Sequence, residues 1–336
     1  MKAFEIQNSF GLDSLTLTER PDPSPGYGQV LIKLRAASLN YRDLMVVKGL
    51  YNPKQPFKRV PLSDGVGEVI AVGEGVTRVK TGSRVAGIFF QKWLCGQLTE
   101  AIAKSALGGA IDGMLAEYAV LHEDGVVHVP ENLTDEEAAT LPCAAVTAWN
   151  ALTTSGGVKA GDTVLVQGTG GVSLFALQFA RLLGARVIAT SSSDEKLERV
   201  RQLGATDGIN YKQTPDWGKR VRELTTDVGV DHVVEVGGAG TLTESLRAVR
   251  YGGQISLIGV LSGGSGEVST ASILMKNVRV QGIYVGSREM FEAMNRAIAH
   301  HLLQPIVDRV FGFEQAREAL AYMESGAHFG KICIRF

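Results

Sequence analysis

The sequence is poor in cysteine, and the few cysteines that it has are far apart. Three occur among 336 residues, Cys95, Cys143 and Cys333, and no pair has Cys-x-x-Cys spacing. This spacing argues against a zinc site built from cysteines. We therefore expect a reducing, cytoplasmic compartment, and we interpret each cysteine as a small buried apolar residue.

Long apolar runs and an excess of charge of one sign are also missing. No apolar stretch is long enough to span a bilayer, and Met1 leads directly into a strand-like segment without a signal peptide. The 34 basic and 35 acidic residues are well mixed and give a formal net charge of −1. We therefore predict neither a membrane nor a nucleic-acid partner. The hydrophobic content of 45% is typical of a globular protein, and the length suggests two domains.

The first 124 residues read as short strands separated by glycine and proline. Val30–Ser38 alternates apolar and polar side chains, which indicates a half-buried strand. Further strands are expected at Gly65–Gly73, Arg84–Phe89 and Ala116–Leu121. Gln91–Asp112 is a long irregular insert of the kind that covers a site or forms a surface lobe. This region is predicted to be mainly β.

The sequence period changes after Asn132. Thr134–Glu137 is a capping box that opens a helix, and strands then alternate with helices. The later strands are expected at Val187–Thr190, Gly208–Asn210, His232–Val236, Gln254–Ile258 and Val278–Tyr284, with helices at Glu195–Leu203, Trp217–Thr225 and Thr241–Val249. With the strand at Thr163–Gln167, this alternation predicts an α/β fold with a doubly wound, six-stranded parallel sheet.

The tail after Gly286 contains helices at Arg288–His301 and Glu314–Met323, strands near Val307–Phe311, and a last strand at Lys331–Arg335. We assign this tail to the first domain. The predicted domains are therefore 1–124 with 287–336, and 125–286.

A glycine turn follows the strand Thr163–Gln167 and precedes an apolar helix, Leu174–Leu183. The turn reads Gly-Thr-Gly-Gly-Val-Ser, and strand, turn, helix and strand together predict a dinucleotide site. Gly168 permits the tight turn, and Gly170 lets the backbone approach a pyrophosphate, which the helix N-terminus attracts. Gly171 and Val172 belong to the same predicted site.

The end of the second strand carries hydroxyl groups where NAD-binding turns usually carry a carboxylate. Ser191, Ser192 and Ser193 occupy this position, and Lys196 follows one helical turn later. Hydroxyls and a lysine suit a 2′-phosphate, so we predict NADP(H) as the cofactor. Ser192 could instead cap the next helix with Glu195 as its capping-box partner, and both roles are compatible. Asp194 opposes the prediction if it turns inward.

The chain resembles the medium-chain dehydrogenase/reductase family from end to end. The resemblance is carried by Val30–Asn40, Gly65–Gly73, Gly113–Val120, Gly168–Ser173, Asn210-Tyr211 and Gly330-Lys331. It implies a GroES-like β domain joined to a Rossmann domain, with the C-terminal tail completing the first. Within the family the chain is similar to the quinone-oxidoreductase-like, zinc-type-alcohol-dehydrogenase-like branch.

Departures from the zinc-dependent members place it in that branch. Those members carry a cysteine near Asn40, a Gly-His-Glu near Ser63 and Asp64, and a further ligand near Val146–Trp149. Here no cysteine is closer to the third position than Cys143, and at most Asp64 could serve as a ligand. A catalytic zinc needs three protein ligands, so we predict no metal.

The resemblance also implies the site residues, at the cleft expected between the domains. Asn40 would orient the nicotinamide or a carbonyl oxygen, and Tyr51 would donate a proton or a hydrogen bond. Asp43 is interpreted as orienting Arg42 or the backbone, and Asp64 as structural or as an acceptor near the ribose.

Further cofactor contacts are implied on both sides of the dinucleotide. Tyr211 would lie against the adenine ribose or phosphate, and Lys331 would approach from the tail; for both, a solvated surface side chain is the alternative. Contacts around the nicotinamide are implied for Thr147, Gly237, Gly259, Val260 and Tyr284.

These residues predict an NADPH-dependent reductase of quinones or α,β-unsaturated carbonyls that works without metal. Such acceptors need less polarisation because conjugation spreads the developing charge. An alcohol dehydrogenase and a non-catalytic NADPH-binding protein remain as alternatives. The edge strand expected at Val278–Ile283 is apolar, and family members pair there, so we expect a homodimer.

Overall fold

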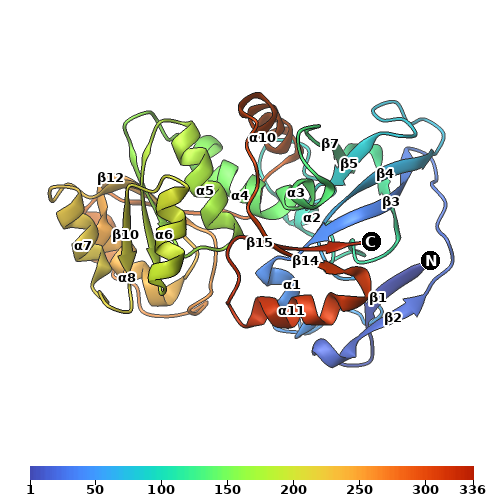
Figure 1. Ribbon diagram of the computed structural model, residues 1–336, viewed down its shortest axis with the longest axis horizontal. Coiled ribbons are helices and arrows are strands. Elements are labelled where there is room, and N and C mark those ends of the chain that lie inside the picture. Colours follow the sequence, from blue (N-terminus) through green and yellow to red (C-terminus); the bar gives the residue numbers. More distant parts are fainter. The chain divides into compact units, whose positions relative to one another are not determined.

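The computed structural model describes residues 1–336, and the chain divides into two units. The first comprises Met1–Val146 and Gly286–Phe336, and the second Thr147–Val285 (Figure 1). The first unit extends past the boundary expected at residue 124. The reason is that β7 (Val126–His128) pairs with β5 (Arg84–Gly87) of the same sheet, and α3 (Asp135–Ala139) packs on that unit.

A seven-stranded sheet forms the centre of the first unit. Its order is β14-β15-β3-β4-β5-β7, and β6 also pairs with β3. The strands not yet given are β3 (Gln29–Ser38), β4 (Asp64–Val72), β6 (Tyr118–His122), β14 (Val307–Gly312) and β15 (Lys331–Arg335). β15 runs antiparallel to β3, with Cys333 opposite Ser38, so the C-terminal tail is part of this sheet. A separate hairpin joins β1 (Lys2–Ile6) and β2 (Leu15–Glu19).

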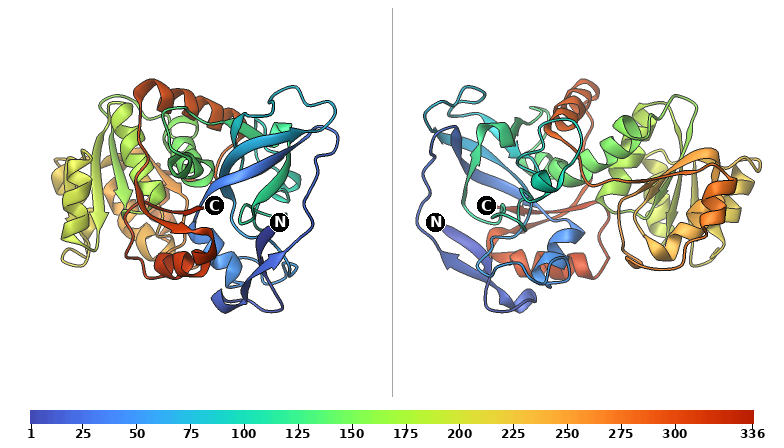
Figure 2. Two further views of the ribbon diagram at one scale, coloured as in Figure 1. Left: turned by 45° about the vertical axis from the view of Figure 1, so that its right-hand side comes forward. Right: turned by 180° about the vertical axis from the view of Figure 1, so that it is seen from behind.

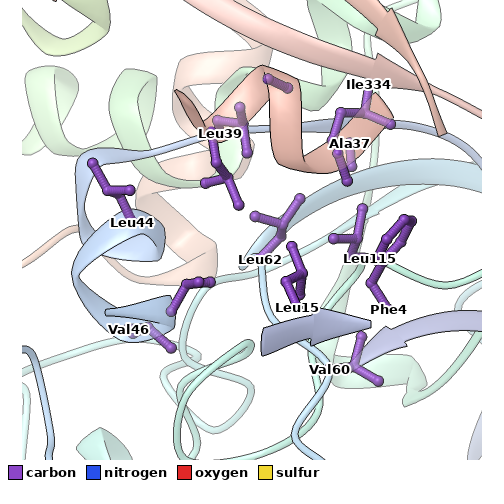
Figure 3. Packing of buried hydrophobic residues seen from close by; sticks show 14 of the residues in the cluster. Phe4, Leu15, Ala37, Leu39, Leu44, Val46, Val60, Leu62, Leu115 and Ile334 are labelled. Carbon is purple, nitrogen blue, oxygen red and sulfur yellow. The ribbon is translucent and has the colours of Figure 1, made fainter. Parts of the chain in front are cut away.

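The core of the first unit fixes the segment that carries Asn40. Leu39, Leu44 and Leu62 are almost fully buried in one cluster with side chains of β1 and β15, which Figure 3 shows from close by. Burying each such leucine stabilises the fold by about 2 kcal/mol. The start of α1 (Tyr41–Val47) is therefore held by packing on both sides of Asn40.

The second unit is a six-stranded parallel sheet in the order β10-β9-β8-β11-β12-β13, which confirms the predicted doubly wound fold. Its strands are β8 (Thr163–Gln167), β9 (Arg186–Ser191), β10 (Asp207–Asn210), β11 (Val230–Glu235), β12 (Val249–Leu257) and β13 (Arg279–Gly282). The connecting helices are α5 (Gly171–Leu182), α6 (Asp194–Gln202), α7 (Trp217–Leu224), α8 (Ala239–Ala248) and α9 (Thr270–Met275). Figure 2 shows the sheet between its helices.

The remaining helices are short, except for one in the C-terminal tail. The long one is α10 (Arg288–His301), and α11 (Ala316–Glu324) follows it in the tail. The irregular insert contains α2 (Glu100–Ala103), and α4 (Val146–Trp149) lies between the π-helical stretches η3 (Leu141–Ala145) and η4 (Asn150–Thr154). Single 3-10 turns are η1 (Leu12–Ser14), η2 (Glu123–Gly125) and η5 (Phe313–Gln315). None of the helices combines the length and apolar character that crossing a bilayer requires.

Three local expectations are corrected by the structure. Cys95 is exposed and not a buried apolar residue, and Cys143 is only partly buried as a residue although its thiol is enclosed. The edge strand β13 is shorter than expected. Val278 and Ile283, which flank it, are both buried, and Val278 packs in the core cluster of the second unit instead of facing outward.

Candidate functional site

The glycine turn of the second unit is open to a ligand. Gly168 adopts φ +70°, which favours glycine, and Gly170 precedes α5 without any side-chain cap. A Cβ atom at either glycine would meet no other atom within 4 Å. Ser173 is buried and its hydroxyl donates to the carbonyl oxygen of Gln167 at 2.5 Å, which closes the helix onto β8. Free N–H groups beside empty space fit a pyrophosphate.

The hydroxyl-rich end of β9 is organised by Ser193 and not by Ser192. Ser193 is the N-cap of α6 and accepts a hydrogen bond from the Lys196 N–H at 3.2 Å, so the expected cap at Ser192 is wrong by one residue. The chain turns one residue later because the Ser193 N–H donates to the Ser191 hydroxyl at 3.3 Å. Ser192 is left half-buried at the helix N-terminus.

The carboxylate of Asp194 is occupied by neighbouring amides. It accepts hydrogen bonds from Asn210 Nδ2 and Gln213 Nε2, both at 2.8 Å. Tyr211 lies beside them, with its N–H bonded to the Ser191 carbonyl oxygen at 3.0 Å and its ring 41% exposed. Amide side chains from the end of β10 and from the loop after it thus satisfy the hydrogen-bond acceptors of Asp194, one of the two acids in the first turn of α6.

Glu235 is a buried carboxylate that the sequence reasoning missed. One of its oxygens accepts from the N–H groups of Gly237 (2.8 Å) and Gly238 (3.0 Å) and from the Thr241 hydroxyl (2.6 Å). The other accepts from Gln167 Nε2 at 2.7 Å and from the hydroxyl of Ser245. Glu235 thereby ties the end of β8 to the end of β11. The sequence did carry a signal for this contact, because the polar residues Gln167 and Glu235 end two largely apolar strands of the parallel sheet.

The other predicted cofactor residues of this unit lie at the ends of its strands and at its first helix. Gly237 follows β11, Gly259 and Val260 follow β12, Tyr284 follows β13, and Thr147 is buried in α4. Val260 and Tyr284 are 46% and 40% exposed, so both present side chains at the surface of the unit.

In the first unit, the start of α1 brings Asn40 and Asp43 together. The Asp43 carboxylate accepts from the Asn40 N–H at 2.8 Å, and Arg42 Nη1 lies 3.4 Å from its other oxygen. This supports the interpretation of Asp43 as an orienting residue. Asp43 is fully buried, and burial raises its pKa although Arg42 opposes the effect.

Arg42 also supports Tyr51. Its guanidinium lies 5.3 Å from the centre of the Tyr51 ring and 4.9 Å from that of Phe89, and it donates to the Leu107 carbonyl oxygen at 2.7 Å. Such cation–π contacts fix the position of an aromatic ring. Tyr51 is 40% exposed, so a side chain held from behind remains open to a ligand.

Asp64 lies at the centre of a buried polar network. Its oxygens accept from the Ser63 hydroxyl at 2.6 Å and from the backbone N–H of Cys143 at 3.1 Å. Burial raises the pKa of Asp64 to about 6, against the nearby charge of Lys331. Asn40 Nδ2 lies 3.4 Å from the Ser63 oxygen.

Lys331 and Cys143 are placed differently from what the sequence suggested. Lys331 is not a solvated surface residue: it is 4% exposed, and its ammonium donates to Asn40 Oδ1 at 2.6 Å. Cys143 was interpreted as a small buried apolar residue outside the third expected ligand position, and its backbone N–H donates to the Asp64 carboxylate. Burial and the Asp64 charge raise the pKa of the Cys143 thiol, so it stays protonated at neutral pH.

A metal ion does not fit these residues. No group of three or more histidine, cysteine, aspartate or glutamate side chains is arranged to hold one. Asn40 and Ser63 stand at two expected ligand positions, and neither side chain is a zinc ligand of choice.

Comparisons with known proteins agree with this combination of a β-rich unit and a nucleotide-binding unit. Residues 26–131 match the model of the alcohol dehydrogenase GroES-like domain, and residues 171–300 match that of the zinc-binding dehydrogenase domain. The chain belongs to the medium-chain dehydrogenase/reductase superfamily. It is an NAD(P)H-dependent oxidoreductase of that superfamily.

Its relatives span different activities. A zinc-type alcohol dehydrogenase-like protein of Schizosaccharomyces pombe is 48% identical, covering 97% of this chain and 96% of the relative. The crystal structure of a putative alcohol dehydrogenase from Sinorhizobium meliloti is 44% identical, with a TM-score of 0.92, covering 100% of this chain and 98% of that one. An acryloyl-coenzyme A reductase of Metallosphaera sedula is 30% identical over 94% of this chain and 95% of the relative.

Proposed function

We propose that the chain is an NADPH-dependent reductase of conjugated carbonyl compounds, quinones or α,β-unsaturated ketones and aldehydes, and that it works without a metal ion. The observation that carries the proposal is that Asn40 and Ser63 occupy two expected metal-ligand positions and form a hydrogen-bonded network with Asp64 and Lys331. The similarity to an acryloyl-coenzyme A reductase, whose substrate is a conjugated thioester, supports it.

The chemistry asks two things of the first unit. The nicotinamide supplies the hydride when bound, so the protein must orient the acceptor and stabilise the negative charge that develops on its oxygen. We assign the donor roles for that oxygen to the Asn40 amide N–H₂ group, which also lies 3.4 Å from the Ser63 hydroxyl, and to the Tyr51 hydroxyl. Tyrosine is a poor base at neutral pH but an acceptable proton donor to an enolate. An acceptor that delocalises charge through conjugation needs no stronger polarisation than these hydrogen bonds.

NADPH is favoured over NADH by the groups at the end of β9. Ser191, Ser192 and the N-terminus of α6 offer hydroxyl and N–H donors, and Lys196 adds a positive charge. Asp194, which would repel a 2′-phosphate, already accepts hydrogen bonds from the side-chain amides of Asn210 and Gln213. Gly168 and Gly170 would leave room for the pyrophosphate beside the backbone.

A homodimer formed through the open edge of β13 and a cytoplasmic location complete the proposal. β13 is the last strand of its sheet and its outer hydrogen-bonding groups have no neighbouring strand. Because Val278 and Ile283 are already buried, pairing would rest on backbone hydrogen bonds and not on apolar side chains at those positions.

The reaction is tested with chelator-treated protein. NADPH and NADH oxidation are followed with a panel of quinones, 2-enones, simple aldehydes and, in reverse, primary alcohols. We expect turnover of quinones or enones with NADPH that the chelator does not reduce. Activity on aldehydes and alcohols alone, lost on chelation, would favour the alcohol dehydrogenase that two of the relatives' names suggest. Tight NADPH binding with no turnover would favour a non-catalytic role.

The cofactor preference is tested separately with Lys196→Ala. Loss of one charge-assisted contact to a phosphate raises the Kd for NADPH by about tenfold and leaves that for NADH unchanged. Lys219→Ala, an exposed lysine of α7 in the same unit, is the matched control. An equal effect on both cofactors would show that Lys196 does not recognise the 2′-phosphate.

A further inference from the structure

Val285 follows β13 and has a backbone conformation that valine rarely adopts. Its φ is +60°, in the left-handed region where a branched side chain crowds the backbone. The next residue, Gly286, could take up this conformation without strain, but the left-handed turn is made by the valine. Such a conformation persists only where the surrounding structure enforces it, and positions of this kind cluster at functional sites.

One buried side chain holds the backbone at this point. Asn150 Nδ2 donates to the Val285 carbonyl oxygen at 2.8 Å. Asn150 and Val285 are only 7% and 4% exposed, so water cannot replace the amide as the partner of that oxygen. Because a buried carbonyl group without a partner is costly, the bond favours the backbone conformation in which the oxygen faces Asn150.

The segment that carries Asn150 is itself unusual. Asn150–Thr154 (η4) is wound as a π-helix, in which the Ser155 N–H donates to the Asn150 carbonyl oxygen at 2.8 Å. The hydroxyl of Ser256 in β12 donates to the Ala151 carbonyl oxygen at 3.3 Å and ties this turn to the sheet. π-Helical turns are rare and occur frequently at functional sites. Two uncommon backbone features are thus joined by one hydrogen bond.

Both features lie next to residues that the sequence predicts to contact the nicotinamide. Thr147 is one helical turn before Asn150, and Tyr284 directly precedes Val285. Thr147 is buried, whereas Tyr284 presents its ring at the surface of the unit. The bond between Asn150 and Val285 therefore connects the two segments of the second unit that carry these predicted contacts.

We propose that Asn150 is a positioning residue for the nicotinamide end of the cofactor. Its amide holds Val285 in the left-handed conformation and so sets the direction in which the chain, with the Tyr284 ring, leaves β13. The segment is then ordered before the cofactor binds, which removes an entropy cost from binding. This role rests on the proposed cofactor site and extends it, because Asn150 acts through Val285 and not by touching the cofactor.

The role is tested with Asn150→Leu, which keeps the approximate size of the side chain and removes the donor. Binding is measured for NADPH and for 2′-phospho-ADP-ribose, which lacks the nicotinamide. We expect the Kd for NADPH to rise about tenfold and that for 2′-phospho-ADP-ribose to stay within about twofold, which also shows that the unit is folded. An equal change for both ligands, including none, would overturn the proposal. Asn150→Ala takes the place of Asn150→Leu if the leucine variant does not fold.

Asn295→Leu is the matched control, because Asn295 of α10 makes the same kind of bond in the first unit. Its Nδ2 donates to the His128 carbonyl oxygen at 2.9 Å, and the residue is 8% exposed. Its loss should lower stability as Asn150→Leu does, while both Kd values stay within about twofold of wild type. A control that raised the Kd for NADPH as much as Asn150→Leu would show general destabilisation and no positioning role.

The strained conformation is tested with Val285→Gly, since glycine adopts the left-handed region readily. If Asn150 acts by holding Val285, Asn150→Leu should raise the Kd for NADPH only about twofold in the Val285→Gly background, against about tenfold in the wild type. The crystal structure of Asn150→Leu should show residue 285 at negative φ. An equal rise in both backgrounds, or an unchanged left-handed valine, would contradict the proposed mechanism.

Failure of the proposed function gives a different result. The binding and crystallographic measurements need no acceptor, so a wild type that reduces no quinone or enone would refute the reductase and leave the role of Asn150 to be decided by them. If the wild type prefers NADH, the same comparison is made with NADH and ADP-ribose. A wild type that binds the dinucleotide no more tightly than the fragment without nicotinamide would overturn the positioning role.

Discussion

The substitution Asp64→Asn tests the buried network through its dependence on pH. Asp64 is fully buried, and its pKa rises from an ordinary value of 3.8 to about 6, chiefly because burial disfavours the charged form. A carboxyl whose pKa is raised in the folded state opposes folding wherever it must be ionised. That cost is fully present above about pH 6 and absent below pH 3.8.

The size of the effect follows from the two pKa values. The difference between 3.8 and about 6 corresponds to about 3 kcal/mol. Asparagine cannot ionise and resembles the protonated carboxyl in shape. The free energy of unfolding of Asp64→Asn, relative to wild type, should therefore rise by up to about 3 kcal/mol between pH 4 and pH 8.

The assay is urea unfolding of both proteins at intervals across that range, since contributions from all other groups cancel in the difference. Asp112→Asn is the control with the opposite sign. Burial alone would raise the pKa of Asp112, but the hydrogen bond from Arg20 holds it below its ordinary value, so that carboxylate stabilises the fold at high pH. A flat difference for Asp64→Asn would refute the reasoning.

Other substitutions test the nucleotide-binding unit by thermal or urea unfolding. Glu235→Gln should lower the unfolding free energy by about 3 kcal/mol, because an amide cannot accept from all the donors that converge on this carboxylate. Phe179→Ala should cost about 3–5 kcal/mol, since its ring is fully buried in α5 against Trp149. Ser193→Ala should lower the unfolding free energy by about 1 kcal/mol, and Ser192→Ala should lower it less. The reverse order would mean that Ser192 is the N-cap of α6, as expected from the sequence.

Local sequence patterns determined the elements of the fold. Thr163–Gln167, Arg288–His301 and Lys331–Arg335 match strands and a helix of the structure residue for residue, because side-chain periodicity and turn residues act over a few positions. The capping box at Thr134–Glu137 is confirmed by reciprocal hydrogen bonds. The glycine turn at Gly168 was readable for the same reason.

Errors occurred where a boundary depends on packing. The strands β2 and β7 were not foreseen, since each is short and is fixed by its partner strand and not by its own sequence. The cap at Ser193 could not be distinguished from Ser192, because three consecutive serines carry the same local signal.

The sequence thus determined the two-part fold and the nucleotide-binding turn, and it singled out Asn40 without predicting the helix α1 that follows it. Only the tertiary structure decided that Lys331, Asn40, Asp64 and Cys143 meet. The reason is physical: β15 and β3 pair across almost the whole chain, and no local period encodes which buried charges will compensate one another. Burial and neighbouring charge, which set the pKa of Asp64 and hold Lys331, exist only once those strands are paired.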